Sequence, residues 1–403
     1  MFLIMHILLL SSIVAQIPEI PEPIVGFSRG LWMLLFMVLF LFNRKRLFQI
    51  RYFSFFFCSL AALFVYIAAC SLFSTLYLHS PAFHLVFPAF IAYAIGCCMP
   101  GNLSEDEVRN LMILYFIYAG LLIGVLISRQ FGSLYDFIGS YEYWYKSKNS
   151  IARIIGAGAL LFLFTRFEKK RNLRLARVLG VLFFLILFVL RSRAALLGIV
   201  TALIYHMFRK RQYMRIALSL TVAVVWMSSV FRNFEEKRYD DLEVEQAFVI
   251  RSMNLDRYDD INRFSGGRVD LFNRTIELIK ENFLVGVGVC DWPVDNFYLN
   301  ITAQLGFLGL LLFMGFVLYR LVLNMKFRVA QFPDDGLMHC LELITVMNFV
   351  VSFFEGGGFL GPGNVMVSLW LLSGYFDARA TMGRLSERPA DKVLTYDERP
   401  VAG

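Results

Sequence analysis

Apolar residues along the chain fall into runs of about 16 to 25 residues, the length that crosses the hydrocarbon core of a bilayer as a helix. A helix satisfies its own backbone hydrogen bonds where no water is present. The pattern therefore predicts an all-α, polytopic membrane protein with about twelve transmembrane helices. The predicted helices cover residues 2–16, 27–42, 52–78, 82–99, 111–127, 151–166, 177–190, 194–208, 215–231, 296–319, 337–354 and 364–376.

Composition supports a membrane protein, because 58% of the 403 residues are hydrophobic and only 17% are charged. An average soluble domain carries about one quarter charged residues. The net charge of +8 does not indicate nucleic-acid binding, since Lys and Arg gather in short loops between apolar runs. The first run lacks the basic start of a signal peptide, which favours a first spanning helix over a cleaved leader.

The basic clusters all fall on loops of one parity when loops are counted alternately from a cytoplasmic N-terminus. By the positive-inside rule that side is the cytoplasm, and both termini lie there. The chain then divides into helices over 1–231, a large periplasmic loop over 232–295, helices over 296–376 and a cytoplasmic tail over 377–403. The clusters are Arg44-Lys45-Arg46, Lys169-Lys170-Arg171 with Arg174 and Arg177, Arg209-Lys210-Arg211, and Arg320 with Lys326 and Arg328.

The large outer loop contains a segment with helical periodicity over residues 269–280. Its apolar residues Phe272, Ile276 and Ile279 recur on one face. A Ser-Gly-Gly sequence precedes it, and Gly286-Val287-Gly288 follows it as an irregular link to the next helix. We expect this amphipathic helix to lie along the membrane surface or over a cavity.

Two arginines in Arg191-Ser192-Arg193 fall in a tight turn on the outer side, where short loops normally avoid arginine. One interpretation is that they cap a hairpin and reach the membrane interface. The other is that they bind an anion, because the planar guanidinium matches phosphate oxygens bidentately. Since the pair departs from the topology rule only here, we favour anion binding.

Arg268 stands where the amphipathic helix opens, and free backbone N–H groups at a helix start attract negative charge. A second phosphate contact and a solvated arginine paired with Asp270 are equally consistent with the sequence. Asp295 begins the helix at 296–319, where it is either an N-cap or a base that accepts a proton from a sugar hydroxyl. Asn296 and Tyr298 are candidate substrate contacts on the same segment, and Glu355 in the last outer loop either lines the same cavity or belongs to a turn.

The sequence predicts no metal site and no cofactor. Other acidic residues alternate with arginine, and oxygen-ligand metal sites need several converging carboxylates. Cysteines lie mostly within apolar runs, without the spacing of a zinc site or a disulfide framework. The five histidines are scattered, and His206 and His339 lie near helix ends toward the cytoplasm.

Four motifs in order resemble the O-antigen ligase and polymerase superfamily of bacterial surface-polysaccharide assembly. They are Arg-Ser-Arg-Ala-Ala-Leu-Leu-Gly at 191–198, Ser-Gly-Gly-Arg-Val-Asp-Leu-Phe at 265–272, Gly-Val-Gly at 286–288, and Asp-Asn-Phe-Tyr-Leu-Asn at 295–300 followed by Gln-Leu-Gly-Phe-Leu-Gly at 304–309. The specific motifs are confined to residues 191–309, while the helix spacing matches over most of the chain.

The resemblance implies a metal-independent glycosyltransferase of the bacterial inner membrane that works at the periplasmic face. Its donor and acceptor would be undecaprenyl-diphosphate-linked glycans, and a chain-length regulator is a possible partner. Arg191, Arg193 and Arg268 would bind the diphosphate, because arginine neutralises charge on the leaving group. Asp295 would orient or activate the acceptor hydroxyl.

Three functions remain open on the sequence. Ligases of this superfamily usually carry His where Asp295 stands, and this departure favours polymerisation of repeat units over ligation to lipid A core. It also leaves open whether position 295 acts as a base. A transporter or flippase is less favoured, because transporters tend to show internal repeats and ionisable residues at mid-membrane, whereas here Glu342 is the main charge within the apolar runs.

Overall fold

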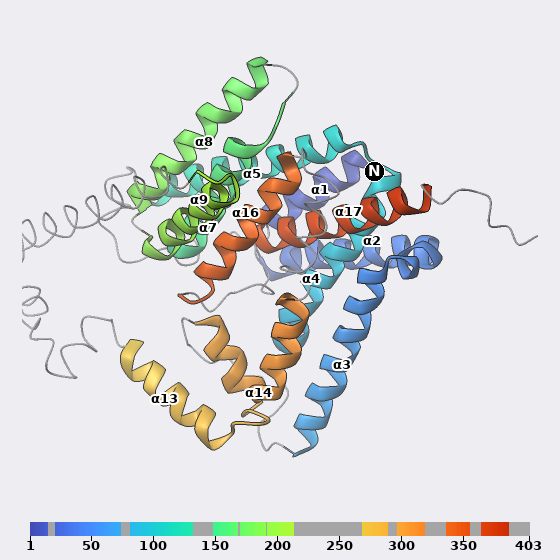
Figure 1. The fold of residues 1–403 in the computed structure, drawn as a ribbon, viewed down its shortest axis with the longest axis vertical. Coiled ribbons are helices and arrows are strands. Elements are labelled where there is room, and N and C mark those ends of the chain that lie inside the picture. The colour runs from blue at the N-terminus through green and yellow to red at the C-terminus, as the bar shows by residue number, and fades with distance from the viewer. Residues whose placement is uncertain are drawn as a thin grey trace, which may run out of the picture.

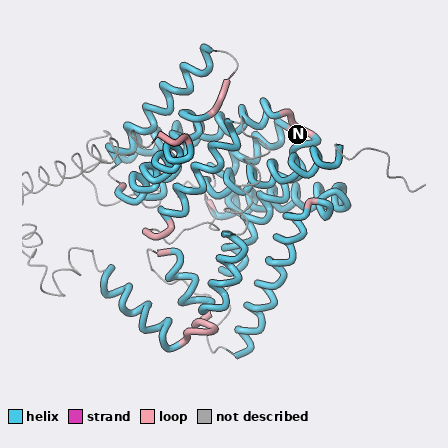
Figure 2. Tube along the Cα trace, viewed as in Figure 1, coloured by secondary structure: helices cyan, strands magenta, loops and turns pink. Residues whose placement is uncertain are grey.

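The computed structural model describes ten stretches of the chain, and every regular element within them is a helix (Figures 1 and 2). The described residues are 1–14, 21–73, 81–131, 148–167, 170–190, 192–212, 268–288, 296–318, 336–354 and 364–386. Their α-helices are α1 Phe2–Val14, α2 Glu22–Gln49, α3 Arg51–Phe73, α4 Pro81–Cys98, α5 Glu105–Phe131, α7 Lys148–Phe164, α8 Lys170–Leu190, α9 Arg193–Arg209, α13 Arg268–Glu281, α14 Phe297–Leu318, α16 Gly336–Val351 and α17 Asn364–Ser386, with a short 3₁₀ turn at Met99–Gly101.

The predicted all-α class is confirmed. Each predicted apolar range overlaps one of these helices, except 215–231, which lies outside the described residues. The amphipathic segment predicted at 269–280 is α13. Among the described residues, three helical segments are long and apolar enough to cross a membrane, namely Pro23–Gln49, Glu105–Gly124 and Phe297–Gly315, and several shorter apolar helices accompany them. The number of spans stays a prediction.

The most closely packed pair of helices is α4 and α17. Aromatic rings fill the space around them, with Trp370 of α17 fully buried and 5.3 Å from the ring of Phe56 on α3. Within this apolar core the Tyr93 hydroxyl donates to the Asp377 carboxylate at 2.8 Å. A buried carboxylate needs such a donor, because burial without one is costly. This bond therefore fixes the rotation of α17 against α4.

Basic side chains gather at one end of the helices, which we call the basic end. Arg46 at the end of α2 lies beside Gly101, just after α4, and contacts Met382 of α17. Arg379 of α17 forms an ion pair with Glu105, the first residue of α5, at 2.7 Å. Arg109 of α5 lies over the ring of Phe167, which follows α7. These contacts bring the ends of α2, α4, α7 and α17 together with the start of α5.

The opposite end, which we call the far end, is defined by contacts of α16. The Asn348 side chain near the end of α16 accepts from Nε of Arg153, near the start of α7, at 2.7 Å. The carbonyl of Ser352, just after α16, accepts from the N–H of Phe297 at the start of α14. Since α9 ends beside the start of α16, it runs antiparallel to α16 and begins at the far end.

Helix α14 folds back on itself at Gly306, whose backbone has φ of 65°. The rings of Phe297 and Phe313 lie 5.2 Å apart, although these residues are separated by sixteen positions. A straight helix would put them about 24 Å apart along its axis. Figure 1 shows the two halves of α14 as a V, a sharp bend that the prediction of one helix over 296–319 did not include.

The bend in α14 is covered by the segment that follows α13. Backbone N–H groups of Val287 and Gly288 donate to Ala303 and Gln304, and that of Phe307 donates back to Phe283 at 2.7 Å. The Tyr66 hydroxyl of α3 donates to the Leu305 carbonyl at 2.7 Å. A broken helix in an apolar environment must satisfy its freed backbone groups in this way. We call the paired segments 283–288 and 303–308 the glycine clasp.

Candidate active site

Several of the predicted site residues lie outside the described residues, namely Arg191, Asp295 and Glu355. For Arg193 and Arg268 the structure describes the backbone only. Arg193 is the first residue of α9, and Arg268 is the first residue of α13. Both therefore stand in a first helical turn, where the free N–H groups and the helix dipole favour negative charge. The roles assigned to these five residues stay predictions.

Ser192 caps α9 and holds the turn between the two predicted arginines. Its side-chain oxygen accepts from the Ala195 N–H at 3.5 Å, and the residue is buried. Serine is a preferred N-cap because it replaces one of the missing helical acceptors. The small buried cap places the first turn of α9 against its neighbours and so fixes the backbone of Arg193 at the far end.

Asn296 is the N-cap of α14. Its Oδ1 accepts from the Leu299 N–H at 3.0 Å. The sequence offered a helix cap as the structural interpretation of Asp295, but the structure gives capping to the next residue. Asn296 therefore caps α14. Its predicted contact with substrate stays a prediction.

Tyr298 anchors α14 to α16. Its hydroxyl donates to the Phe349 carbonyl at 3.1 Å, and its ring lies 4.5 Å from that of Phe353. Together with the bond from Phe297 to Ser352, these contacts fix the start of α14 against the end of α16. Tyr298 thus has a defined part in the fold, and its predicted contact with substrate is not tested.

A further arginine at the far end was not singled out from the sequence. Arg153 of α7 is buried, with 9% of its surface exposed, and it donates to Asn348. Buried arginines are rare, because a desolvated charge must be compensated. The signal was present as Arg153 inside the apolar run 151–166, but a sequence does not show which residues of a run face lipid and which face the protein.

Helix α13 packs against α14 and ends at the glycine clasp. Thr275 is fully buried, whereas the next residue, Ile276, is 39% exposed. Of the three apolar residues predicted to share one face, Phe272 and Ile279 are half-buried and Ile276 faces outward. The clasp therefore ties the helix that begins with Arg268 to the helix that Asn296 caps.

His206 and His339 meet each other at the basic end, away from the far end. Among the described residues, no group of three or more His, Cys, Asp or Glu side chains is arranged to hold a metal ion. The described far end offers helix starts, the buried Arg153 and neutral hydrogen-bonding side chains.

Comparison with protein families identifies the segment that contains α9 and α13 whole and most of α8 and α14. Residues 178–314, about a third of the chain, match the family described as O-antigen ligase. The chain carries an O-antigen ligase domain. This match confirms the predicted O-antigen ligase and polymerase superfamily, and it covers all the motifs on which that prediction was based. A search of curated proteins gave no match.

The match over residues 178–314 fits a glycosyltransferase-type enzyme of polysaccharide or lipopolysaccharide biosynthesis. Together with the apolar helices, it indicates a membrane protein. The match does not separate polymerase from ligase.

Proposed function

We propose that the chain polymerises undecaprenyl-diphosphate-linked oligosaccharide repeat units into a surface polysaccharide, at the periplasmic face of the bacterial inner membrane. The observation that carries the proposal is the order of the motifs at 191–309, all within the O-antigen ligase match at 178–314. In this proposal the chain has about twelve spanning helices, with both termini in the cytoplasm.

The reaction replaces one bond at the anomeric carbon by another. The acceptor hydroxyl oxygen forms a bond to that carbon, the bond to the diphosphate oxygen breaks, and the hydroxyl proton is released. Negative charge grows on the polyprenyl diphosphate as it leaves. Donors placed in advance around that charge lower the barrier, and arginine supplies them without a metal. We assign this role to Arg191, Arg193 and Arg268.

The arrangement of helix starts supports this assignment. Arg193 and Arg268 each open a helix, so backbone N–H groups add to the positive field around the diphosphate. In the proposed topology the far end faces the periplasm, since the basic end carries Arg46, Arg109, Arg209 and Arg379. The lipid chains of donor and acceptor would lie against the apolar helices, and the glycans would lie under the large loop.

Polymerisation is preferred to ligation because Asp295 stands where ligases of the superfamily usually carry His. In a polymerase Asp295 would orient or activate the hydroxyl of the incoming lipid-linked unit. The second candidate is an O-antigen ligase that uses the same donor and arginines but transfers the glycan to lipid A core. Transport stays a weaker alternative.

The test is the banding pattern of the surface polysaccharide in a strain that lacks this protein. A polymerase mutant leaves single repeat units attached, whereas a ligase mutant leaves none. Complementation with Arg193→Ala or Arg268→Ala should fail to restore long chains, with a loss of about 10²- to 10³-fold in rate, as for removal of one charge-stabilising donor. Arg193→Lys should restore little, because a point charge lacks the planar fork.

The control is Arg174→Ala, which removes an exposed arginine of α8 outside the motifs. It should restore long chains fully. Protein in the membrane is quantified for every variant. Normal chain lengths with Arg193→Ala and Arg268→Ala, at normal protein levels, would contradict the proposal.

A further inference from the structure

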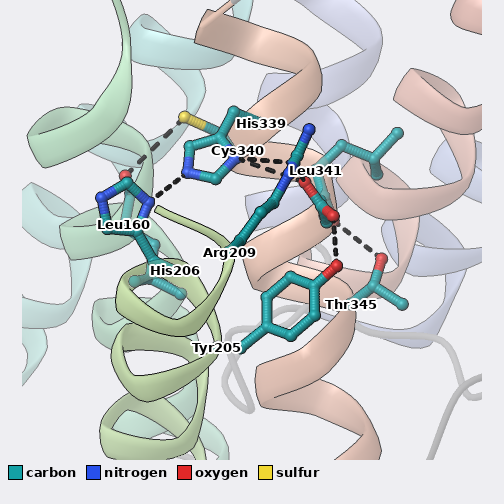
Figure 3. Close-up of polar contacts among 9 residues, drawn as sticks. Leu160, Tyr205, His206, Arg209, His339, Cys340, Leu341 and Thr345 are labelled. Atoms are coloured by element: carbon teal, nitrogen blue, oxygen red, sulfur yellow. Dashed lines mark hydrogen bonds and ion pairs between the residues drawn. The ribbon is translucent and has the colours of Figure 1, made fainter. Parts of the chain in front are cut away.

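Helix α9, within the O-antigen ligase match, and helix α16, which lies beyond it, meet in a polar network at the basic end. The network joins Tyr205, His206 and Arg209 near the end of α9 to His339 and Glu342 near the start of α16 (Figure 3). The two histidines are 133 positions apart in sequence. No motif of the superfamily resemblance includes these residues.

Glu342 is the centre of the network. Its carboxylate is 3% exposed, and it forms an ion pair with Arg209. The Tyr205 hydroxyl donates to its other oxygen, and Nδ1 of His339 lies 3.2 Å from the carboxylate. A buried carboxylate is stable only when it is paired and hydrogen-bonded, so removal of one partner leaves a costly charge. These three contacts to one buried carboxylate hold the end of α9 against the start of α16.

The histidines extend the network toward α7. Nδ1 of His206 and Nε2 of His339 lie 2.6 Å apart, so one nitrogen donates and the other accepts. The ring of Phe164, the last residue of α7, lies 4.6 Å from His206 and 5.6 Å from His339. Close by, the Cys340 thiol reaches carbonyls of Leu160 and Leu161. The end of α9 is thereby held against both α16 and α7.

We infer that this network positions α9. It fixes the axial position of α9 relative to α16, and hence the depth at which Arg193 stands at the far end. Arg193 and Arg209 are the first and last residues of α9. The helix is rigid over the roughly 24 Å between them, so an axial shift at one end is transmitted to the other. Between the two ends α9 packs closely on α16 along its length. The inference rests on the proposed function, because it assigns Arg209 and Glu342 an effect on the donor diphosphate site.

The network side chains do not touch the substrate in this scheme, since they lie at the opposite end of the helix. Their loss should therefore weaken the use of donor without removing a reacting group. Packed helices occupy discrete arrangements, and steps of one helix past another are a known way in which distant sites are coupled.

The test compares Arg209→Gln with Lys210→Gln in the purified protein reconstituted with lipid-linked repeat units. Both changes remove one positive charge at adjacent positions, but Lys210 is exposed at the helix cap, whereas Arg209 pairs with Glu342. Arg209→Gln should lower the rate at limiting donor by roughly tenfold or more, within the usual range of coupling between distant sites. Lys210→Gln should leave it unchanged, and Arg209→Lys should restore most of the loss.

Non-additivity separates positioning from general destabilisation. If Arg209 acts through Arg193, the combination of Arg209→Gln with Arg193→Lys should lose little more than Arg193→Lys alone. Multiplicative losses would overturn the inference, as would an Arg209→Gln protein that matches Lys210→Gln. Should Arg209→Gln fail to accumulate, Tyr205→Phe removes only the hydroxyl bond, and full activity of that variant would also overturn it.

Measurement of Arg193→Ala in the same assay distinguishes this inference from the proposed function. Normal activity of Arg193→Ala would overturn the proposed function itself. An inactive Arg193→Ala with an unaffected Arg209→Gln would overturn only the positioning role of the network.

Discussion

At the scale of single residues, the start of α14 shows two neighbouring side chains whose contributions can be separated. Asn296 satisfies the Leu299 N–H and so stabilises the helix. Asp295 precedes it and carries the carboxylate to which we assign the acceptor hydroxyl. Because the cap is accounted for by Asn296, loss of activity at position 295 would not be explained by loss of that cap.

Substitution of Asn296 should therefore lower the stability of the protein, whereas substitution of Asp295 should lower its activity. Asn296→Ala should cost about 1 kcal/mol of stability, the usual value for an N-cap, and lower the Tm of the detergent-purified protein. Asp295→Asn and Asp295→Ala should both reduce chain extension by about 10²- to 10⁴-fold if the carboxylate takes a proton. Thermal melting and the rate of extension are measured on the same preparations. An active Asp295→Asn enzyme would exclude the role as a base.

At the scale of elements, the glycine clasp explains two motifs that the sequence showed only as irregular links. The left-handed backbone at Gly286 and Gly306 lets the two segments approach until a Cβ on either would meet the other's backbone within 2.4 Å. The clasp fixes α13, which begins with Arg268, to α14, which begins beside Asp295. Its exposed tip carries the stacked rings of Phe283 and Phe307.

A methyl group at either glycine should open the clasp. Gly306→Ala and Gly286→Ala should each destabilise the protein by at least about 2 kcal/mol, because the left-handed conformation is strained for alanine and the contacts are to backbone. Gly315→Ala is the matched control on α14, since a Cβ there meets nothing within 4 Å. The measurement is the melting temperature of each variant, which should fall for Gly306→Ala but not for Gly315→Ala. Equal melting temperatures for these two variants would contradict the described bend.

The sequence was sufficient for the helices but not for their bends and polar contacts. The ranges of α4, α7 and α16 followed from apolar runs, because the length of a run is a local property. The fold-back at Gly306 could not be predicted, since the apolar run continues through it and glycine is common in membrane helices. The contacts of His206 with His339 and of Arg153 with Asn348 depend on tertiary packing. The residues of each pair are more than a hundred positions apart, so their spacing in the sequence does not indicate the contact.

At the scale of the whole molecule, the described helices have two chemically different ends. The basic end brings together arginines of α2, α5, α9 and α17, although their positions in the sequence are far apart. The far end brings together the starts of α7, α9 and α14 with the end of α16. This arrangement agrees with the alternation of loops expected from the positive-inside rule, and it puts the motif residues Ser192 and Asn296 at the end away from the basic clusters.

The central claim is that arginines at the periplasmic end hold the lipid diphosphate, and sidedness is its most direct test. Single cysteines replace Arg193 or Lys170 in a protein without its native cysteines, and intact cells are treated with a membrane-impermeant maleimide. The account predicts that the cysteine at 193 is labelled from outside and that the cysteine at 170 is labelled only after lysis. Labelling of position 170 in intact cells, with position 193 protected, would contradict it.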